Sequence, residues 1–364
     1  MHELPSRTPT PTPWPWAITL ALCACASSPA KTSSATATAP PATPTLASTP
    51  LALPGAPTPT NFDDFQFDPA SGKLLIPSGQ AGNLDIVDPA THGVTAIGGF
   101  STQPAPNGHH GGITSASAGA GLWFTTDRSS RTLSAIDPAR GKVVATAKLS
   151  GGPDYVRYVA PTSEVWVTEP HDGGVVEIFK LEPGATPTLT RTGSFAVPDA
   201  PESLAVDVTR GRVYTNDEPK QKTEAYDIKT HALVATWANA CTGEASGLVL
   251  DEARGFAVVG CGEGAASVID VAHDGKKLGY VQVVTKTDII AFDTSTSHVY
   301  VPGAESGTMA ILGLSPAGEL SVLGLAAAAH GSKCVVVDDR HTAYVCDPEH
   351  GQLLVVNDPF PATR

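Results

Sequence analysis

A repeat of about 45 residues constrains the fold of this chain more than any other feature. Seven short apolar segments each lead into turn-forming residues. One equivalent residue marks each copy: Asp88, Asp137, Leu181, Asp227, Asp270, Leu314 and Asp358. Four-stranded blades of a β-propeller repeat at roughly 40–45 residues. One such sheet cannot bury both of its faces, but neighbouring copies can cover them. The repeat therefore predicts an all-β, seven-bladed β-propeller of four-stranded antiparallel blades over residues 45–364.

The clearest unit spans residues 201–239. It holds four short runs rich in β-branched and aromatic residues, which is typical of strands: Ser203–Val206, Arg212–Thr215, Thr223–Tyr226 and Leu233–Thr236. Turn-forming residues such as Asp207 and Gly211 separate the runs. The same pattern divides the chain into units at about 62–100, 111–150, 154–197, 202–239, 245–284, 288–326 and 333–359.

The second run of several units carries a family resemblance. Val213-Tyr214-Thr215-Asn216 resembles the Tyr-Val-Thr-Asn motif of the YVTN-repeat propellers, and looser copies begin at Trp123, Trp166, Tyr300 and Tyr344. The resemblance covers residues 45–364 and implies a seven-bladed propeller. We expect the aromatic residues to pack one blade against the next. The resemblance leaves the activity open, because this fold hosts many unrelated functions.

Residues 1–25 are typical of a bacterial export signal. The apolar core Ala17–Ala24 is too short to span a bilayer, and Leu22-Cys23-Ala24-Cys25 resembles a lipobox that would make Cys25 the lipidated N-terminus. Plain secretion, or a tail with a chance apolar patch, are the alternatives. Residues 26–44 are rich in Pro, Ala, Thr and Ser, which predicts a disordered tether. We expect an exported, lipid-anchored protein of the cell envelope, or else a secreted or periplasmic one.

The last unit ends at Asp358-Pro359, after its third run, so it lacks a fourth strand. Residues 45–53 resemble the outer run of the third unit and precede the first unit. An N-terminal strand from this segment would complete the last blade and close the ring, which removes two open sheet edges.

Four cysteines lie within the repeat. Cys334 and Cys346 flank one predicted hairpin, and Cys241 and Cys261 lie at the same end of another. An even number of cysteines in an exported chain favours disulfides, so we predict Cys334–Cys346 and Cys241–Cys261. Thiolate metal ligation is the alternative, although no CxxC spacing supports it.

Charge and loop length indicate where ligands bind. The formal net charge is −13, which argues against nucleic-acid binding and is compatible with cationic ligands. Connections between the second and third runs and between units are longer than the other turns, as in 101–110 and 217–222. Both kinds fall on one face of the disc, and function commonly lies in long loops on a rigid scaffold. We expect a monomer that meets a membrane only through its N-terminal lipid.

One register position brings carboxylates to the mouth of the central channel on that face. In each unit we take the residue five positions before the turn that follows the first strand. In chain order these residues are Asp63, Gly111, Asp154, Glu202, Ser246, Asp288 and Lys333, and Glu244 lies close to the fifth of them, Ser246. Packed carboxylates repel one another and can be matched by a hard cation such as Ca²⁺. The alternative is a solvated acidic rim that binds no ion.

Histidines form a second candidate group on the same face. His109, His110, His171, His330 and His350 all map to its loops, where a cluster could bind a transition metal or supply a general base. We single out His110, His171 and His330. His-Gly is also a common element of YVTN repeats, which accounts for His110-Gly111 and His330-Gly331 without any activity.

No GxSxG, Walker or HExxH motif is present. The preferred interpretation is a non-catalytic binding module that meets a protein, glycan or small ligand through the long-loop face and channel mouth. The alternative is a hydrolase resembling the propeller lactonases, in which the mouth carboxylates hold a divalent cation that polarises an ester carbonyl. A cofactor-bearing propeller like the quinoprotein dehydrogenases ranks last, since no cofactor ligands stand out.

Overall fold

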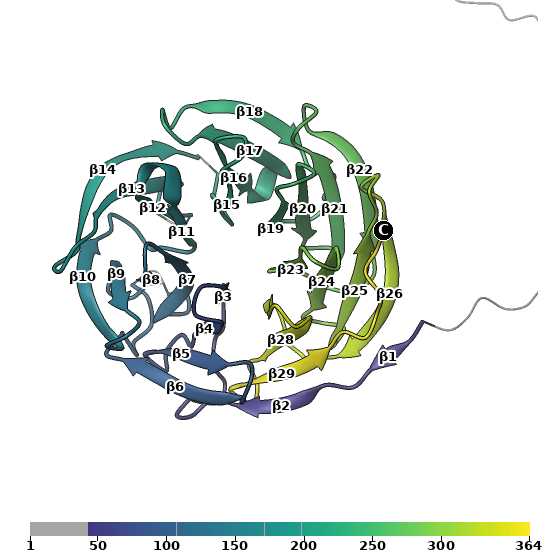
Figure 1. Ribbon diagram of the computed structural model, residues 1–364, viewed down its shortest axis with the longest axis horizontal. Coiled ribbons are helices and arrows are strands. Elements are labelled where there is room, and N and C mark those ends of the chain that lie inside the picture. Colours follow the sequence, from purple (N-terminus) through teal and green to yellow (C-terminus); the bar gives the residue numbers. More distant parts are fainter. Residues whose placement is uncertain (1–42, 107, 171, 198) are drawn as a thin grey trace, which may run out of the picture. The chain divides into compact units, whose positions relative to one another are not determined.

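Seven blades of four antiparallel strands form a ring, as the repeat predicts, and one of the seven sheets has a fifth strand (Figure 1). The computed structural model describes residues 43–106, 108–170, 172–197 and 199–364. Within each sheet, consecutive strands pair antiparallel, so each blade is a meander from the channel to the rim. The first strand of each blade lies nearest the axis in Figure 1. The export segment, Cys25 and most of the predicted tether lie outside the described residues.

The strands of blades 1 to 4 follow the chain in order. They are β3(Gln66–Asp68), β4(Lys73–Pro77), β5(Asn83–Asp88), β6(Gly93–Gly98), β7(Ile113–Gly119), β8(Leu122–Asp127), β9(Thr132–Asp137), β10(Lys142–Lys148), β11(Val156–Val159), β12(Glu164–Glu169), β13(Val175–Glu182), β14(Thr188–Ala196), β15(Ala205–Asp207), β16(Arg212–Asp217), β17(Lys222–Asp227) and β18(Leu233–Ala238). Short 3₁₀ turns, η1(Ala160–Thr162) and η2(Glu218–Lys220), interrupt blades 3 and 4.

Blades 5 and 6 repeat the pattern, and blade 7 takes its fourth strand from the N-terminal side. Their strands are β19(Ala245–Asp251), β20(Phe256–Cys261), β21(Ala265–Asp270), β22(Lys276–Gln282), β23(Ala291–Asp293), β24(His298–Gly303), β25(Thr308–Leu314), β26(Leu320–Ala327), β27(Val335–Val337), β28(Thr342–Asp347), β29(Gln352–Asn357) and β2(Thr49–Ala52).

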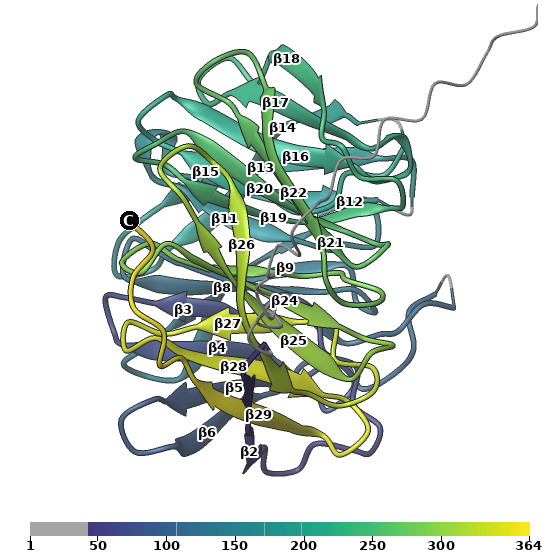
Figure 2. The same cartoon turned by 90° about the vertical axis from the view of Figure 1, so that its right-hand side faces the viewer.

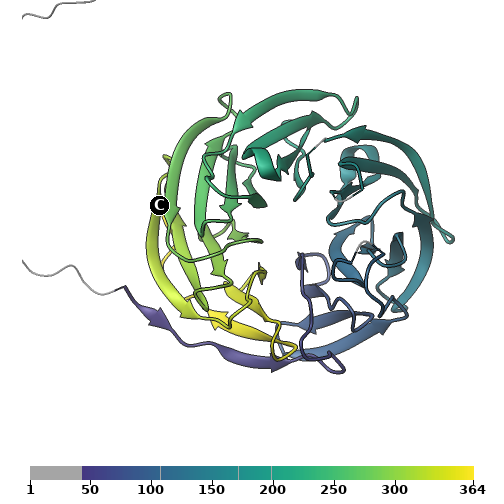
Figure 3. The same cartoon turned by 180° about the vertical axis from the view of Figure 1, so that it is seen from behind.

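The N-terminal closure is confirmed. β2 pairs antiparallel with β29, with Thr49 opposite Val355 and Ala52 opposite Gln352. The preceding strand, β1(Thr45–Leu46), does something the sequence did not predict: it pairs parallel with β26 of blade 6. Figure 3 shows the purple N-terminal segment running along the outside of the yellow C-terminal blade. Residues 45–52 therefore cover edges of two neighbouring blades.

The two faces of the disc differ in their connections. The strands run from one face of the ring to the other (Figure 2). Because each blade is a meander, the first-to-second and third-to-fourth turns share one face, which we call the short-turn face. The second-to-third connections and the blade-to-blade segments share the other, the long-loop face.

The motif aromatics pack between blades, as expected. Trp166, Tyr214, Tyr300 and Tyr344 are fully buried in the second strands of their blades. Their polar atoms find partners: the Tyr214 hydroxyl donates to Asp207 over 3.0 Å, and the Trp166 indole N–H donates to Glu164 over 3.0 Å. These residues supply large apolar area without leaving a buried donor unpaired.

Both predicted cysteine pairs lie at disulfide distance. The Cα atoms are 5.2 Å apart in Cys241–Cys261 and 5.6 Å apart in Cys334–Cys346, inside the range that a disulfide requires. Each pair joins the inner part of a blade at its long-loop end, in blades 5 and 7. Among the described residues no helix is long and apolar enough to cross a membrane.

Candidate binding site at the channel mouth

Residues just ahead of the first strands form a ring at the long-loop end of the channel. Asp63, Asp154, Glu202, Asp288 and Lys333 occupy it. Backbone hydrogen bonds between blades hold these residues at the same level along the channel. The Ile289 N–H donates to the Lys333 carbonyl over 2.9 Å, and the Asp64 N–H donates to the Thr114 carbonyl over 3.0 Å. We call this set, with Thr114 and Ser246, the mouth ring.

The position assigned to Gly111 was wrong. Thr114 takes that place in blade 2: the Asp64 bond reaches it, and it stands five residues before Gly119, the last residue of β7. The turn after β7 is shorter than the turn after β3, since Gly119 pairs with Leu122 whereas Asp68 pairs with Lys73, so the count from the sequence began at the wrong residue. The Thr114 hydroxyl donates to the Asp154 carbonyl over 3.0 Å, so blade 2 contributes a neutral link to the ring.

A chain of alternating charges runs through the mouth ring across five blades. Lys333 Nζ lies 3.2 Å from Asp288 and 3.8 Å from Asp63. Arg128 Nη2 lies 3.4 Å from the other oxygen of Asp63 and also pairs with Asp154. The side chains of Asp63, Arg128 and Asp154 are nearly buried, whereas those of Lys333 and Asp288 are about a third exposed. The carboxylates predicted from register therefore do converge, but two basic side chains lie between them.

Arg128 was missed by the sequence reasoning. It directly follows β8 in the second-to-third connection of blade 2, and its guanidinium also donates to the carbonyls of Pro153 over 3.0 Å and His110 over 3.3 Å. Glu218 occupies the corresponding place after β16 in blade 4. The signal that could have found both is a charged residue immediately after a second strand, since that position ends beside the channel.

Blade 4 holds two acids at the mouth that have no ion pair among the described residues. Glu202 is buried in the mouth ring, and no ion pair to it or to Glu218 occurs in the described part of the chain. The Ser246 hydroxyl donates to Glu218 over 3.2 Å. Five carboxylates (Asp63, Asp154, Glu202, Glu218 and Asp288) thus face two basic side chains at the mouth.

The excess of acid shows in the pKa values. Burial, reinforced by the charge of Asp154, raises the pKa of Glu202 well above its usual range. Burial also raises the pKa of Asp154 to about 6, although Arg128 opposes the rise. The pKa of Glu218 is raised to about 7 by burial and by Glu244 and Asp288. The mouth therefore holds protons on some of its carboxyl groups near neutral pH.

The basic members are held in their charged forms. Burial works against the charge on Arg128 and on Lys333, but the neighbouring carboxylates outweigh it and raise the pKa of both side chains. Asp154 and Asp63 provide most of this effect at Arg128, and Asp63 and Asp288 at Lys333. Both groups therefore stay cationic over the whole range in which the mouth carboxyls titrate.

The remaining predicted residues lie farther out. Glu244 is on the rim, with 60% of its side chain exposed and Lys286 4.0 Å away. His110 is also largely exposed. Partial burial of its ring, together with the positive charges of Lys333 and Arg128, lowers its pKa. His330 is exposed on the connection into blade 7. His171 lies outside the described residues.

The residues at the mouth do not fit the calcium ion that the sequence suggested. In the described ranges, no group of three or more His, Cys, Asp or Glu side chains is arranged to hold a metal ion. Arg128 and Lys333 instead fill the spaces between carboxylates that a cation would need. The Ca²⁺ site and the metal-dependent hydrolase remain predictions from the sequence, and we derive no chemical step from them.

Comparison with known proteins supports the fold alone. No family model matches the sequence, and no curated protein matches it. The structure is similar to the β-propeller domain of Cps50 (Swd1) from Myceliophteria thermophila, with a TM-score of 0.65 and 12% identity over 82% of this chain and 98% of that one. It is similar to a chain of a mitotic checkpoint complex, with a TM-score of 0.67 and 10% identity over 85% of this chain and 91% of that one. U3-55K matches with a TM-score of 0.68 and 9% identity, over 85% of this chain and 98% of that one.

These similarities confirm a seven-bladed propeller and leave the YVTN family and a bacterial origin as predictions. The identities are too low to carry an activity across from any of these proteins, and a fold of this kind hosts many functions. The function has to be argued from the mouth itself.

Proposed function

We propose that this protein is a non-catalytic binding module whose channel mouth takes a basic side chain of a partner protein. The observation that carries the proposal is that five carboxyl groups at the mouth face only two basic side chains. A buried carboxylate that lacks a partner is costly, and here the cost is met by protonation. A Lys or Arg side chain entering the mouth would replace those protons with a direct ion pair.

The accessible part of the mouth lies over blades 4 to 6. Glu218 is half-buried, the side chain of Asp288 is 27% exposed and Glu244 stands on the rim. On the opposite side, Asp63 and Asp154 already pair with Arg128 and are nearly buried. The incoming cation would therefore contact Glu218 and Asp288 first, with Glu202 behind them. A rigid propeller that presents such a patch acts as a scaffold for protein interaction.

The proposal is tested by equilibrium titration of a labelled tetralysine peptide at low ionic strength. We expect saturable binding that weakens with salt, because the Debye length falls to about 10 Å at 0.1 M. Glu218→Gln should weaken binding about tenfold, since a charged hydrogen bond is lost. Binding should also weaken as the pH falls through the range of about 7 to 6, where Glu218 and Asp154 gain protons.

Glu182→Gln is the matched control, because Glu182 is exposed at the opposite, short-turn end of β13. It makes the same change in net charge as Glu218→Gln at a distance from the mouth. Equal loss of affinity in the two variants would show that the peptide responds only to the overall negative charge. Absence of saturable binding in the unaltered protein would also overturn the proposal.

We further propose that the protein is exported and held at a membrane through lipid on Cys25. Two cysteine pairs at disulfide distance support an oxidising location, and the lipobox-like residues 22–25 support the anchor. Mass spectrometry of the mature N-terminus, combined with fractionation of a Cys25→Ala variant, tests both points. We expect Cys25 of the unaltered protein to carry a lipid. The Cys25→Ala variant should lack the lipid and be released into the soluble fraction. An unmodified N-terminus would contradict the anchor.

A further inference from the structure

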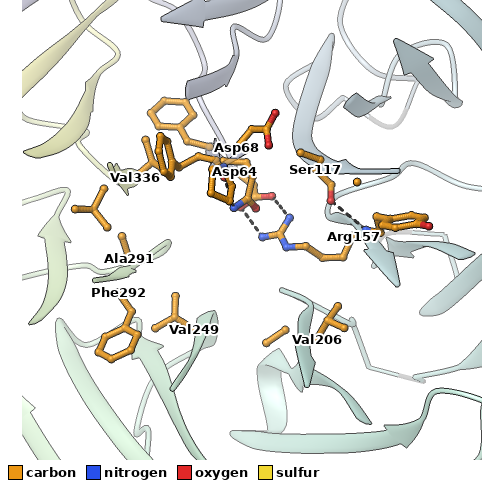
Figure 4. Close-up of a pocket in the computed structure, with 18 of the residues that line it drawn as sticks. Asp64, Asp68, Ser117, Arg157, Val206, Val249, Ala291, Phe292 and Val336 are labelled. Atoms are coloured by element: carbon orange, nitrogen blue, oxygen red, sulfur yellow. Dashed lines mark hydrogen bonds and ion pairs between the residues drawn. The ribbon is translucent and has the colours of Figure 1, made fainter. Parts of the chain in front are cut away.

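A cavity of about 980 Å³ lies in the channel on the other side of the mouth ring (Figure 4). Its lining begins one residue beyond the ring, at Asp64, Tyr155, Ser203 and Ile289. It continues along the first strands to turn residues such as Pro69 on the short-turn face. The cavity is thus separate from the long-loop face and faces the opposite side of the disc. Its size falls at the upper end of the range of about 300–1,000 Å³ typical of small-molecule pockets.

The walls of this cavity are largely apolar. Val206 of β15, Val249 of β19, Phe292 of β23 and Val336 of β27 surround it in Figure 4. Val206, Val249 and Phe292 are only half-buried although they belong to the innermost strands. Apolar side chains that remain partly exposed to water inside a concave site favour an apolar ligand, because the ligand removes their surface from water.

One ion pair forms part of the cavity wall, and its two opposite charges cancel. Arg157 of β11 reaches Asp64 with two hydrogen bonds, Nη1 to Oδ2 over 2.5 Å and Nη2 to Oδ1 over 2.9 Å (Figure 4). Nη1 also donates to the carbonyls of Ala116 and Val156. The Nε–H and the second N–H of Nη2 have no acceptor in the described part of the chain. The guanidinium therefore keeps free donors, while its charge is already matched.

The other buried carboxylates of the lining already have donors. Asp68 accepts from the Trp123 indole over 2.8 Å, Asp293 pairs with the His341 ring over 2.5 Å, and Asp338 accepts from the Thr342 N–H over 2.9 Å. The donors to Asp68 and Asp338 are neutral groups, and Arg157 is the one basic side chain in the described lining. An anionic ligand would lose its hydration without gaining a free counter-charge, and the carboxylates would repel it, so the lining favours an uncharged acceptor over an anionic one.

We propose that this cavity binds an uncharged small molecule with an apolar body and one hydrogen-bond acceptor, such as a carbonyl, which receives a hydrogen bond from Arg157. The apolar part packs on Val206, Val249, Phe292 and Val336, and the acceptor satisfies the free donors of the guanidinium. This site is independent of the basic partner proposed for the mouth. Either site can exist without the other.

The test uses the neutral fluorophore prodan, a naphthalene with a ketone, and the analogue 2-(dimethylamino)naphthalene, which lacks the ketone. We expect one prodan per chain, with a blue-shifted emission and an affinity about fivefold above that of the analogue, since one neutral acceptor is added. Val206→Trp places a large ring on the apolar wall where the probe packs, and should weaken both probes about tenfold. Arg157→Lys keeps a cation beside Asp64 but replaces the planar guanidinium, with its Nε–H and second Nη2 N–H, by a shorter ammonium group, and should reduce the preference for prodan.

Val208→Trp is the matched control, because Val208 lies two residues from Val206 but is 51% exposed and outside the lining. It should bind both probes like the unaltered protein. Equal binding by the Val206→Trp and Val208→Trp variants would overturn the proposal, as would non-saturable binding. Equal affinity of the unaltered protein for the two probes would overturn the role of Arg157. The probe comparison needs no variant, so it decides that role even if Arg157→Lys fails to fold.

Discussion

Lys333 lies 3.8 Å from Asp63, although one residue opens the last blade and the other opens the first. The same ammonium group lies 3.2 Å from Asp288 of blade 6. This contact closes the ring from inside the channel, where β2 closes it from the outside. The charge chain therefore has a structural role in addition to the binding role proposed for the mouth.

Lys333→Met should destabilise the fold. The substitution keeps the length of the side chain but leaves Asp63 and Asp288 without this partner. Removing one member of a buried pair costs about 3–5 kcal/mol, and the partial exposure of Lys333 and Asp288 reduces the expected loss in the free energy of unfolding to about 2 kcal/mol. Urea unfolding at pH 7 measures it. Lys286→Met, at an exposed pair with Glu244, is the control and should change stability by less than about 0.5 kcal/mol.

A second prediction concerns pH. A carboxyl with a folded pKa above its unfolded value of about 4 contributes stability below the unfolded value and loses it as the pH rises through the folded value. Asp154, with a pKa of about 6, and Glu218, with one of about 7, belong to this class, as does Glu202. The melting temperature should therefore fall from pH 5 to pH 8.

Glu202→Gln separates the mouth from other groups that titrate in this window. His350, whose pKa is raised by Asp347, would lower stability in the same direction and is unaffected by the substitution. The Gln variant cannot ionise, so its melt should fall less between pH 5 and pH 8, and at pH 8 it should be more stable than the unaltered protein. An identical pH slope in the two proteins would show that Glu202 is ionised in the folded state.

The repeat predicted the blades well because its signal is local. Strand residues such as Val213-Tyr214-Thr215 and turn residues such as Gly211 alternate at a fixed spacing, and a fixed spacing sets the number of blades. The carboxylates of the mouth followed from the same register, since Asp63, Asp154, Glu202 and Asp288 each stand five residues before the last residue of a first strand.

What the sequence did not reveal depends on the third dimension. Arg128 and Glu218 reach the channel from loops, and their direction depends on how each loop packs against the next blade. The exchange of Gly111 for Thr114 follows from where β7 ends, because its turn to β8 is shorter than the corresponding turn of blade 1. The Arg157–Asp64 pair joins blades 3 and 1 past blade 2, so neither residue suggests the other in the sequence.

The cysteine pairs give a third prediction. Cys334 and Cys346 are 12 residues apart and Cys241 and Cys261 are 20 apart, and closing a loop of about 15 residues contributes about 3 kcal/mol in the chain-entropy model. The Cys334→Ala/Cys346→Ala double variant should lose stability of that order. Alkylation of the unreduced, unfolded chain should label none of the four cysteines. Labelling of either pair would contradict the corresponding bridge.

The fourth prediction separates the two N-terminal strands. Leu51 of β2 is partly buried and packs on the core that includes Leu353 and Val355, whereas Leu46 of β1 packs at the edge of the core between blades 6 and 7. Leu51→Asp should destabilise the closure of blade 7, because an unpaired charge would enter that core. Leu46→Asp should weaken only the short edge pairing with β26, which involves two residue pairs.

Thermal unfolding distinguishes these effects, together with hydrogen exchange resolved by blade. We expect Leu51→Asp to lower the melting temperature by several degrees and to expose the amides of β29, while Leu46→Asp changes exchange mainly in β26. Deleting residues 43–53 should reproduce both effects, since it opens both edges. A deletion that leaves the melt unchanged would mean that β29 needs no outer partner, and the ring would then be held closed by the contacts at Lys333.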